Sequence, residues 1–329
     1  MLSRVANSLY WMNRYLERVE NTARLIESQL HMLLDLPSMR QDPNAWKPLV
    51  DITGDNKYFT ENFKGYDREH VIFFHTFDKN YPHSITSCIT AARENARSVR
   101  EIIPSEMWEN INNLYLDIVE PGSSLRASSA PHKFYLNIKM SCHLIQGIAY
   151  STMAHGEAWS FSELGRLLER ADKTSRILDV KYFIILPRID FVGSSLDSVQ
   201  WTALLKSTSS LEMYRKRFNL ISSKNIVDFL VFDREFPRSI RYCIHHAERA
   251  FFNISGTPFG VYDTDLARQF GKLMGKLNYS YVDEVMDIGL HQFLDEIQSD
   301  LNNISSVIHD NFFAVRPVNE INQSGVQTQ

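Results

Sequence analysis

The sequence predicts an all-α protein, a tandem-duplicated helical bundle with pseudo-twofold symmetry and about 10 to 12 helices. Three observations predict this fold class. Apolar residues recur at steps of three and four, Pro- and Gly-containing segments separate these periodic stretches, and related blocks recur in the same order along the 329-residue chain. Steps of three and four place apolar side chains on one face of a helix, where they can pack against another helix.

Two blocks show the repeat most clearly. The decapeptide "YLERVENTAR" (Tyr15–Arg24) has a near copy, "LLERADKTSR" (Leu167–Arg176), 152 positions later. The 22-residue block Val71–Ala92 shares nine residues with Ile226–Ala247, 155 positions later, without gaps. Repeated blocks in a kept order indicate one structural unit present twice.

A third pair of blocks extends the repeat, because "HKFYLNIKMSCHLI" (132–145) resembles "HQFLDEIQSDLNNI" (291–304). We therefore expect residues 1–154 and 155–315 to be two related repeats, merged into one globule because no linker separates them. Residues 316–329 are polar, and we expect a disordered tail there.

The periodic segments, taken in order, predict the individual helices. The apolar seams fall at residues 16–33, 85–103 and 164–178, and we expect about five or six helices in each repeat. Helix breakers separate them in "DLPSMRQDP", "TGDN", "EPGSSLRASSAP", "LPRIDFVGSS" and "SGTPFG". Ser84 and Ser239 each follow a proline by two residues and are predicted N-caps. "VIFFHTF" and "IVDFLVF" are apolar enough for strands, but each occurs once per repeat without a hairpin partner, so we predict helix.

The composition is typical of a soluble globular protein, with 44% hydrophobic and 22% charged residues. A net charge of −4 gives no reason to expect a nucleic acid or an anionic membrane as a partner. No apolar run approaches the roughly 18 residues of a membrane span, and early charges argue against a signal peptide. Cys88, Cys142 and Cys243 form no CxxC pair, so we expect reduced core thiols in a cytoplasmic protein.

The charges of the repeated decapeptide fall on one side of its helix, away from the apolar seam. Favourably spaced pairs are Glu20–Arg24 and Asp172–Arg176 at i,i+4, and Arg14–Glu17 and Arg166–Glu169 at i,i+3. Exposed pairs contribute only about 0–1 kcal/mol each, so stability alone explains the repetition poorly. Three roles stay open: an interior structural network, a ligand or substrate site, and a solvated face.

Glu and Arg are adjacent on four predicted helices, so convergence of these helices would form a polar layer inside the bundle. Arginine suits such a layer because its planar fork pairs bidentately with carboxylates and phosphates. The candidate residues of this polar, anion-binding layer are Arg14, Glu17, Arg18, Glu20, Arg24, Arg93, Glu94, Arg97, Arg166, Glu169, Arg170, Asp172, Arg176, Glu248 and Arg249.

Three segments carry a family resemblance: "MLSRVANSLYWMNRYLERVENTARLIE", "GEAWSFSELGRLLERADKTSRILD" and "FPRSIRYCIHHAERAF". They closely resemble the alpha-E family, a bacterial all-helical family named for its repeated Glu-Arg motif, over about residues 1–315. By this resemblance the motif falls on Glu17/Arg18, Glu169/Arg170 and Glu248/Arg249, whereas Arg93/Glu94 has the reverse order. Members of the family occur beside a circularly permuted ATP-grasp amide ligase and a transglutaminase-like cysteine peptidase, sometimes fused to the ligase. The resemblance therefore implies these two partners and work in a peptide- or amide-forming system.

The residues themselves predict little catalytic chemistry. No GxxxxGK[ST] or GxGxxG is present to cradle phosphates, so we expect no bound cofactor. His245-x-x-Glu248 inverts the Glu-x-x-His spacing of di-metal bundles and lacks a counterpart in the first repeat, so we expect no metal site. Arginines beside Glu17 and Glu169 should hold these carboxyl groups ionised, which disfavours general-acid action.

Two functions follow as hypotheses. In the first, the chain is an accessory or scaffold protein that positions the ligase or its peptide substrate and has no catalytic activity alone. In the alternative, an enzyme uses the Glu/Arg layer to bind and transform a carboxylate-bearing peptide. An open pocket containing these residues favours the enzyme, whereas a closed ion-pair network with an exposed apolar patch elsewhere favours the scaffold.

Overall fold

The computed structural model describes residues 1–185 and 195–314, and this part of the chain is helical without strands. The α-helices are α1 Ser3–Asp35, α2 Lys47–Thr53, α3 Asn56–Asn62, α4 Arg68–Thr76, α5 Ile85–Ser98, α6 Ser105–Val119, α7 Ser123–Ser129, α8 Pro131–Thr152, α9 Glu157–Ile185, α10 Ser195–Ser207, α11 Leu211–Arg217, α12 Ser223–Val227, α13 Ile240–Ser255, α14 Asp265–Tyr279, α15 Val282–Ile288 and α16 Leu290–Ile308. A 3₁₀ segment (Pro37–Gln41) and two π-helical turns (Asp228–Phe232 and His309–Phe313) complete the elements.

The all-α class is confirmed, but the predicted number of about 10 to 12 helices is wrong, because the described residues form 16. Six of the sixteen have seven residues or fewer and are too short to show an apolar period; they are α2, α3, α7, α11, α12 and α15. One of them, α7, lies inside "EPGSSLRASSAP", which the sequence predicts as a breaker. It begins after Gly122, whose φ of 104° fits the left-handed conformation that glycine adopts without strain.

Several local predictions are confirmed. The Ser84 hydroxyl accepts from the Ser87 N–H at 3.1 Å, and Ser239 accepts from Tyr242 at 3.0 Å, so both serines cap their helices. "VIFFHTF" is helical in α4, and "IVDFLVF" is helical in α12 and the following π turn. The three cysteines are buried and reduced. "LPRIDFVGSS" falls almost entirely within 186–194, and that stretch and the tail 316–329 lie outside the described residues.

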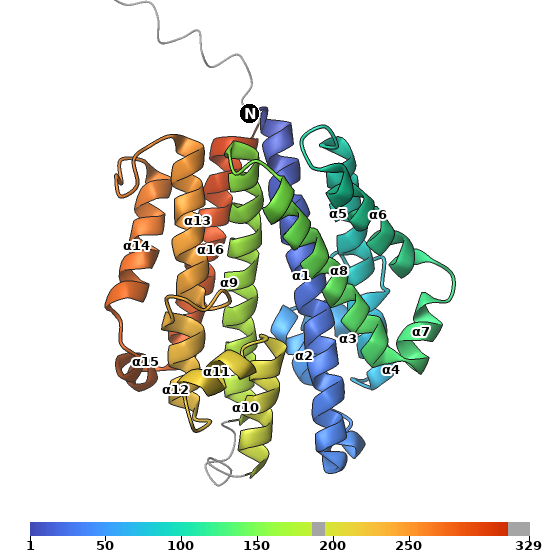
Figure 1. Ribbon diagram of the computed structural model, residues 1–329. Coiled ribbons are helices and arrows are strands. Elements are labelled where there is room, and N and C mark those ends of the chain that lie inside the picture. Colours follow the sequence, from blue (N-terminus) through green and yellow to red (C-terminus); the bar gives the residue numbers. More distant parts are fainter. Residues whose placement is uncertain (186–194, 315–329) are drawn as a thin grey trace, which may run out of the picture.

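The two longest helices, α1 and α9, run side by side through the middle of the molecule (Figure 1). The seam predicted for α1 is buried, with Leu16, Val19 and Ile26 all at most 2% exposed. On α9, Leu164 and Leu168 are buried in the same way. One hydrophobic cluster continues from these seams into the neighbouring helices, so α1 and α9 form the centre of the core.

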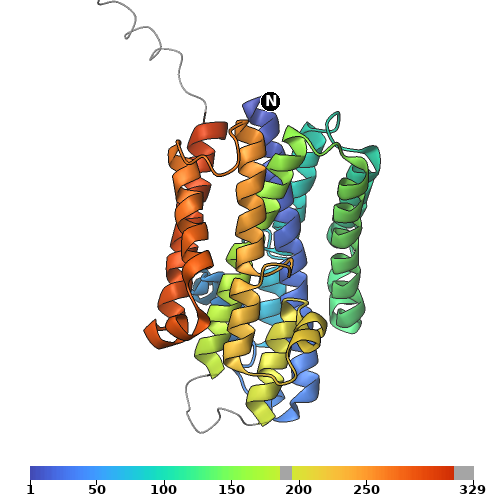
Figure 2. The same ribbon diagram turned by 60° about the vertical axis from the view of Figure 1, so that its left-hand side comes forward.

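The other long helices cover this central pair on two sides. Helices α5 and α8 pack on α1, and α6 packs on both of them. Helices α13 and α16 pack on α9, and α14 packs on α13 and α16. Both views place α14–α16 (orange to red) on one side of the molecule and the teal to green helices on the other (Figures 1 and 2). Within the described residues, no helix is long and apolar enough to cross a membrane.

A glycine allows the closest approach of α1 and α9. A Cβ placed on Gly165 of α9 would lie 2.2 Å from the backbone carbonyl oxygen of Tyr10 in α1, far inside van der Waals contact. The obstacle is backbone rather than a flexible side chain, so a larger residue requires the helices to move apart. The approach brings the polar faces of the two helices within reach of each other.

We expect Gly165→Ala to destabilise the protein by about 1–3 kcal/mol, because overpacking of this rigid contact outweighs the better helix propensity of alanine. Urea unfolding measures the change. Gly275→Ala in α14 is the matched control, since a Cβ there meets nothing within 4 Å. That variant should gain about 0.5–1 kcal/mol. A neutral or stabilising Gly165→Ala would contradict the close approach.

Candidate functional site

Two buried ion pairs connect α1 and α9 in a reciprocal arrangement. Glu17 of α1 accepts from Arg170 of α9 through two parallel bonds, Nε to Oε1 at 2.8 Å and Nη2 to Oε2 at 2.7 Å. Glu169 of α9 accepts from Arg18 of α1 in the same way, at 2.6 and 2.9 Å. Both carboxylates are completely buried. Each Glu-Arg dipeptide therefore supplies the acid of one pair and the base of the other.

Further donors complete the coordination of both carboxylates. Arg14 donates its Nε–H to Glu169 Oε2 at 2.9 Å. The amide of Asn21 donates to Glu17 Oε1 at 3.1 Å, and Arg238 approaches the same oxygen at 3.3 Å. Buried charges are tolerated when they are paired and hydrogen-bonded in this way.

Glu20 is another buried carboxylate of this layer, and four groups surround it. Arg24 and Arg238 each form a close ion pair with Oε1. His143 Nε2 lies 2.9 Å from the same oxygen, and Gln146 donates to Oε2 at 3.1 Å. The two latter residues come from α8, so this cluster connects α8, α1 and the segment before α13.

The surrounding cations hold these carboxylates in the ionised form. Burial by itself raises the pKa of Glu169, but Arg18 and then Arg14 override it, so the pKa stays well below its usual value. In the same way, Arg170 overrides burial and lowers the pKa of Glu17. Burial lowers the pKa of Arg238 to about 10, so this side chain is still a cation at neutral pH.

Two of the predicted intrahelical pairs form and two do not. Glu20 pairs with Arg24, and Arg176 donates to Asp172 at 2.9 Å. Arg14–Glu17 and Arg166–Glu169 do not form, because both glutamates turn between the helices toward the arginines of the opposite Glu-Arg dipeptide. Arg14 crosses to α9 instead, and Arg166 pairs with Glu163 at 2.8 Å.

The Glu and Arg residues of α5 and α13 stay outside this layer. Arg93 and Arg97 pair with Glu94 on the outer side of α5, where all three side chains are 27–64% exposed. Glu248 is buried but accepts from the Tyr262 hydroxyl at 3.0 Å, while Arg249 is exposed. Of these four helices, α1 and α9 contribute both residues of the Glu-Arg dipeptide to the layer, because their polar faces point at each other and those of α5 and α13 do not.

The sequence prediction missed Arg238, His143 and Gln146. A signal for Arg238 was present, since the repeat aligns it with His83, and both precede an N-cap serine by one residue. The structure gives both residues related places, because His83 Nδ1 lies 2.7 Å from Arg18 Nη1. His143 and Gln146 carry no comparable signal, since their role depends on which face of α8 meets α1.

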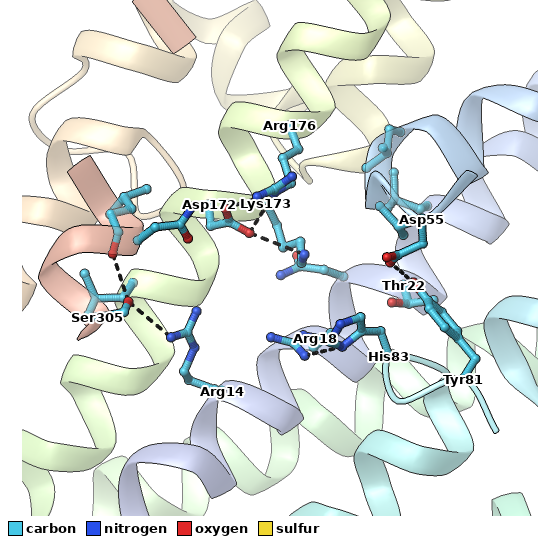
Figure 3. A pocket seen from close by; sticks show the side chains of 17 residues that line it. Arg14, Arg18, Thr22, Asp55, Tyr81, His83, Asp172, Lys173, Arg176 and Ser305 are labelled. Carbon is cyan, nitrogen blue, oxygen red and sulfur yellow. Dashed lines mark hydrogen bonds and ion pairs between the residues drawn. The ribbon is translucent and has the colours of Figure 1, made fainter. Parts of the chain in front are cut away.

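A cavity of about 210 Å³ opens on the Glu169 side of the layer (Figure 3). Its wall includes Arg14 and Arg18 from α1 and Asp172, Lys173 and Arg176 from α9. Asp55, Tyr81, His83, Asn302 and Ser305 line it from the neighbouring segments. The cavity is therefore mainly cationic and borders the ion-pair layer directly.

The described residues offer little for nucleophilic or metal chemistry. Burial raises the pKa of Cys88 and of Cys243 to about 11, so both thiols stay protonated at neutral pH. Within 1–185 and 195–314, no group of three or more His, Cys, Asp or Glu side chains is placed to hold a metal ion. The chemistry supported by the arrangement is charge pairing and anion binding.

These contacts define a class of all-helical protein in which buried, reciprocal Glu–Arg pairs connect the two longest helices. The chain belongs to the Alpha-E family, described as a predicted alpha-helical domain with a conserved ER motif, whose model matches residues 1–313. In this chain, Glu-Arg dipeptides occur on α1, α9 and α13.

Among similar proteins are two described as uncharacterised, from Mycobacterium bovis and Mycobacterium tuberculosis. Each is 22% identical to this chain over 325 residues, which cover 93% of this chain and 35% of the relative. The chain thus spans about a third of the length of these relatives. No solved structure matches it.

We expect Glu169→Gln to destabilise the protein by about 3–5 kcal/mol, because it leaves two arginines without their buried counterion. Urea unfolding followed by circular dichroism measures the loss. Glu94→Gln removes a carboxylate that also serves two arginines, but on the surface, and should cost at most about 1 kcal/mol. Equal effects of the two variants would show that burial of the layer contributes nothing.

Acid should weaken the layer in a defined direction. The folded chain holds the pKa values of Glu17, Glu20 and Glu169 below their usual range, so below about pH 4.3 the unfolded chain binds protons that the folded chain does not. The stability that these groups contribute is fully present above that pH. It is lost as the pH falls through the lowered folded values.

Urea midpoints between pH 6 and pH 3 measure this dependence. The decline should be shallower in Glu169→Gln, which has one fewer such carboxylate. A decline of the same steepness in wild type and Glu169→Gln would contradict the ionised state of Glu169.

Proposed function

We propose that this chain is an accessory protein of a bacterial peptide- or amide-forming system and has no catalytic activity alone. It would act with an ATP-grasp amide ligase and a transglutaminase-like peptidase, the partners that the family resemblance implies. We place it in the cytoplasm, where the ligase has ATP and the three thiols stay reduced. Its role would be to hold the ligase or its peptide substrate in position.

The observation that carries the proposal is the closed state of the Glu–Arg layer. Glu17, Glu20 and Glu169 are buried, and arginines bind each of them. A carboxylate that is ionised and already coordinated is poorly suited to donate or accept a proton during a reaction. The layer thus supports a structural role, in which it fixes the relative position of α1 and α9.

An exposed apolar row on α8 offers a contact surface for a protein partner. Leu136, Met140 and Leu144 recur every four residues and are 45%, 56% and 53% exposed. That spacing places them in one line along the helix. Rows of this kind on the surface are typical of interaction sites, and we propose that the ligase contacts this one.

The relatives are compatible with a role beside other domains. They match this chain over a third of their own length, so most of each relative is additional sequence. A module that acts with a partner can occur both as a separate chain and inside a longer one.

We also propose that the chain arose by tandem duplication and that residues 1–154 and 155–315 are related by a pseudo-twofold axis. The support is the reciprocal pairing of two Glu-Arg dipeptides that lie 152 positions apart in sequence. The neighbours correspond as well, since α5 and α8 pack on α1 as α13 and α16 pack on α9.

The alternative, an enzyme that transforms a carboxylate-bearing peptide, has one observation in its favour, the cavity beside the layer. The cavity contains cations that would bind such a substrate. The assay that tests the accessory role includes the chain alone and therefore also tests this alternative.

The test is ATP hydrolysis by the cognate ATP-grasp ligase with acceptor peptides, with and without this chain. We expect the chain to be inactive alone and to raise the rate of the ligase several-fold. Met140→Glu should abolish the stimulation, because it places a charge in the centre of the apolar row. Ile288→Glu on α15, where the side chain is 69% exposed, is the matched control and should stimulate as wild type does.

Two results would overturn the proposal. Transformation of the peptide by the chain alone would favour the enzyme. A ligase rate that does not change on addition of the chain would exclude an accessory role in this reaction.

A further inference from the structure

We infer that the cavity beside Glu169 is a binding site for an amino acid or a short peptide, with the carboxylate of the ligand held by Lys173 and Arg14. Neither the accessory role nor the apolar row on α8 requires this site. The inference is also independent of the partner, because binding is measured on the chain alone.

The layer has two sides, and the residues around Glu20 on the Glu17 side are longer than their counterparts around Asp172 on the Glu169 side. On the Glu17 side, Glu20 is occupied by Arg238, while His143 and Gln146 approach from α8. The repeat aligns these positions with shorter side chains on the other side, and the aligned pairs are Glu20 with Asp172, Arg238 with His83, His143 with Asn302, and Gln146 with Ser305. Asp172, His83, Asn302 and Ser305 all line the cavity.

Each of these replacements shortens the side chain. The Glu169 side therefore has side chains at the corresponding positions, but they occupy less space. The cavity of about 210 Å³ is several times the roughly 30 Å³ that one water molecule occupies in the liquid. It therefore admits a molecule of the size of an amino acid or a dipeptide.

The charge of the cavity selects an anion. Four cationic side chains line it, Arg14, Arg18, Lys173 and Arg176. Against them stand the carboxylates of Asp55 and Asp172 in the wall and of Glu169 behind it, which pairs with Arg14 and Arg18, so one cation is in excess. On the Glu17 side, the position that corresponds to Asp172 is occupied by Glu20, whose carboxylate pairs with Arg24 and Arg238. On the Glu169 side, a carboxylate of the ligand would take the place that the shorter Asp172 leaves.

Lys173 is one group available for that contact. Its ammonium lies 3.3 Å from Asp172 and 3.9 Å from Glu169, both longer than the ~2.8 Å of a charge-assisted hydrogen bond. Its donors are thus only weakly used by the protein. Arg14 and Arg18 reach toward the same space from α1 (Figure 3), and Arg14 also donates to Ser305 at 3.3 Å.

The opposite wall of the cavity favours a ligand that carries an amino group as well. Asp55 lines the cavity near α2 and accepts from the Tyr81 hydroxyl at 2.6 Å. Figure 3 places this pair across from Arg14. A carboxylate at the cationic end and an ammonium toward Asp55 match the charges of both walls, which inorganic phosphate does not.

Calorimetric titration of the full chain tests the inference. The probes are L-alanyl-L-alanine, its C-terminal amide, its N-acetyl form and inorganic phosphate. We expect the free dipeptide to bind and each blocked form to bind about tenfold more weakly, since each loses a hydrogen-bonded charge. Phosphate should bind more weakly than the free dipeptide.

Three variants locate the site. Lys173→Met should weaken dipeptide binding about tenfold. Asn302→His/Ser305→Gln places the side chains of the Glu17 side in the cavity and should abolish binding. Lys139→Met is the matched control, because that lysine is equally buried in an ion pair with Glu27 of α1 but lies outside the cavity, and it should bind as wild type does.

Thermal unfolding shows whether each variant is folded. If Lys173→Met does not fold, the binding result of Asn302→His/Ser305→Gln tests the inference instead. The inference fails if the dipeptide does not bind to wild type, or if it binds equally to wild type and to the double variant. Phosphate binding tighter than dipeptide binding would overturn the assigned ligand class.

Discussion

The reciprocal Glu17–Arg170 and Glu169–Arg18 pairs are the constraint on which the rest of this structure depends. Four charges lie between the two longest helices, away from water, where an unpaired charge is very costly. Each carboxylate reaches its arginine only when α1 and α9 have one relative height and rotation. The pairs therefore specify the arrangement of the central helices, whereas the apolar seams would tolerate neighbouring registers.

This constraint explains features that otherwise look unrelated. The helices must approach closely for side chains to meet in bidentate geometry, and Gly165 permits that approach where its backbone meets Tyr10. The flanking helices then supply what the pairs leave unsatisfied: α8 brings polar groups to Glu20, and the segment before α13 brings Arg238. The candidate ligand cavity arises where the second set of flanking residues is too short to do the same.

The sequence predicted the helical class and the N-caps, because periodicity and local hydrogen bonding depend on near neighbours in the chain. It assigned Arg14 to Glu17 because spacing along one helix identifies only partners on that helix. The observed partner, Glu169, depends on how α9 docks. Arg238 and Ser305 lie far from the motif in sequence, so their roles depend on tertiary packing. Short helices such as α7 carry too few residues to show a period.

The reciprocal pairing has a consequence for how such a chain can be divided. In an isologous interface, residue i of one copy meets residue j of the other, and j meets i. Glu17 with Arg170 and Arg18 with Glu169 follow this rule at an offset of 152 residues. A chain of half the length would bring one buried acid and one buried base that cannot pair with each other across the helix interface. Two such chains would satisfy both, because each would supply the acid of one pair and the base of the other.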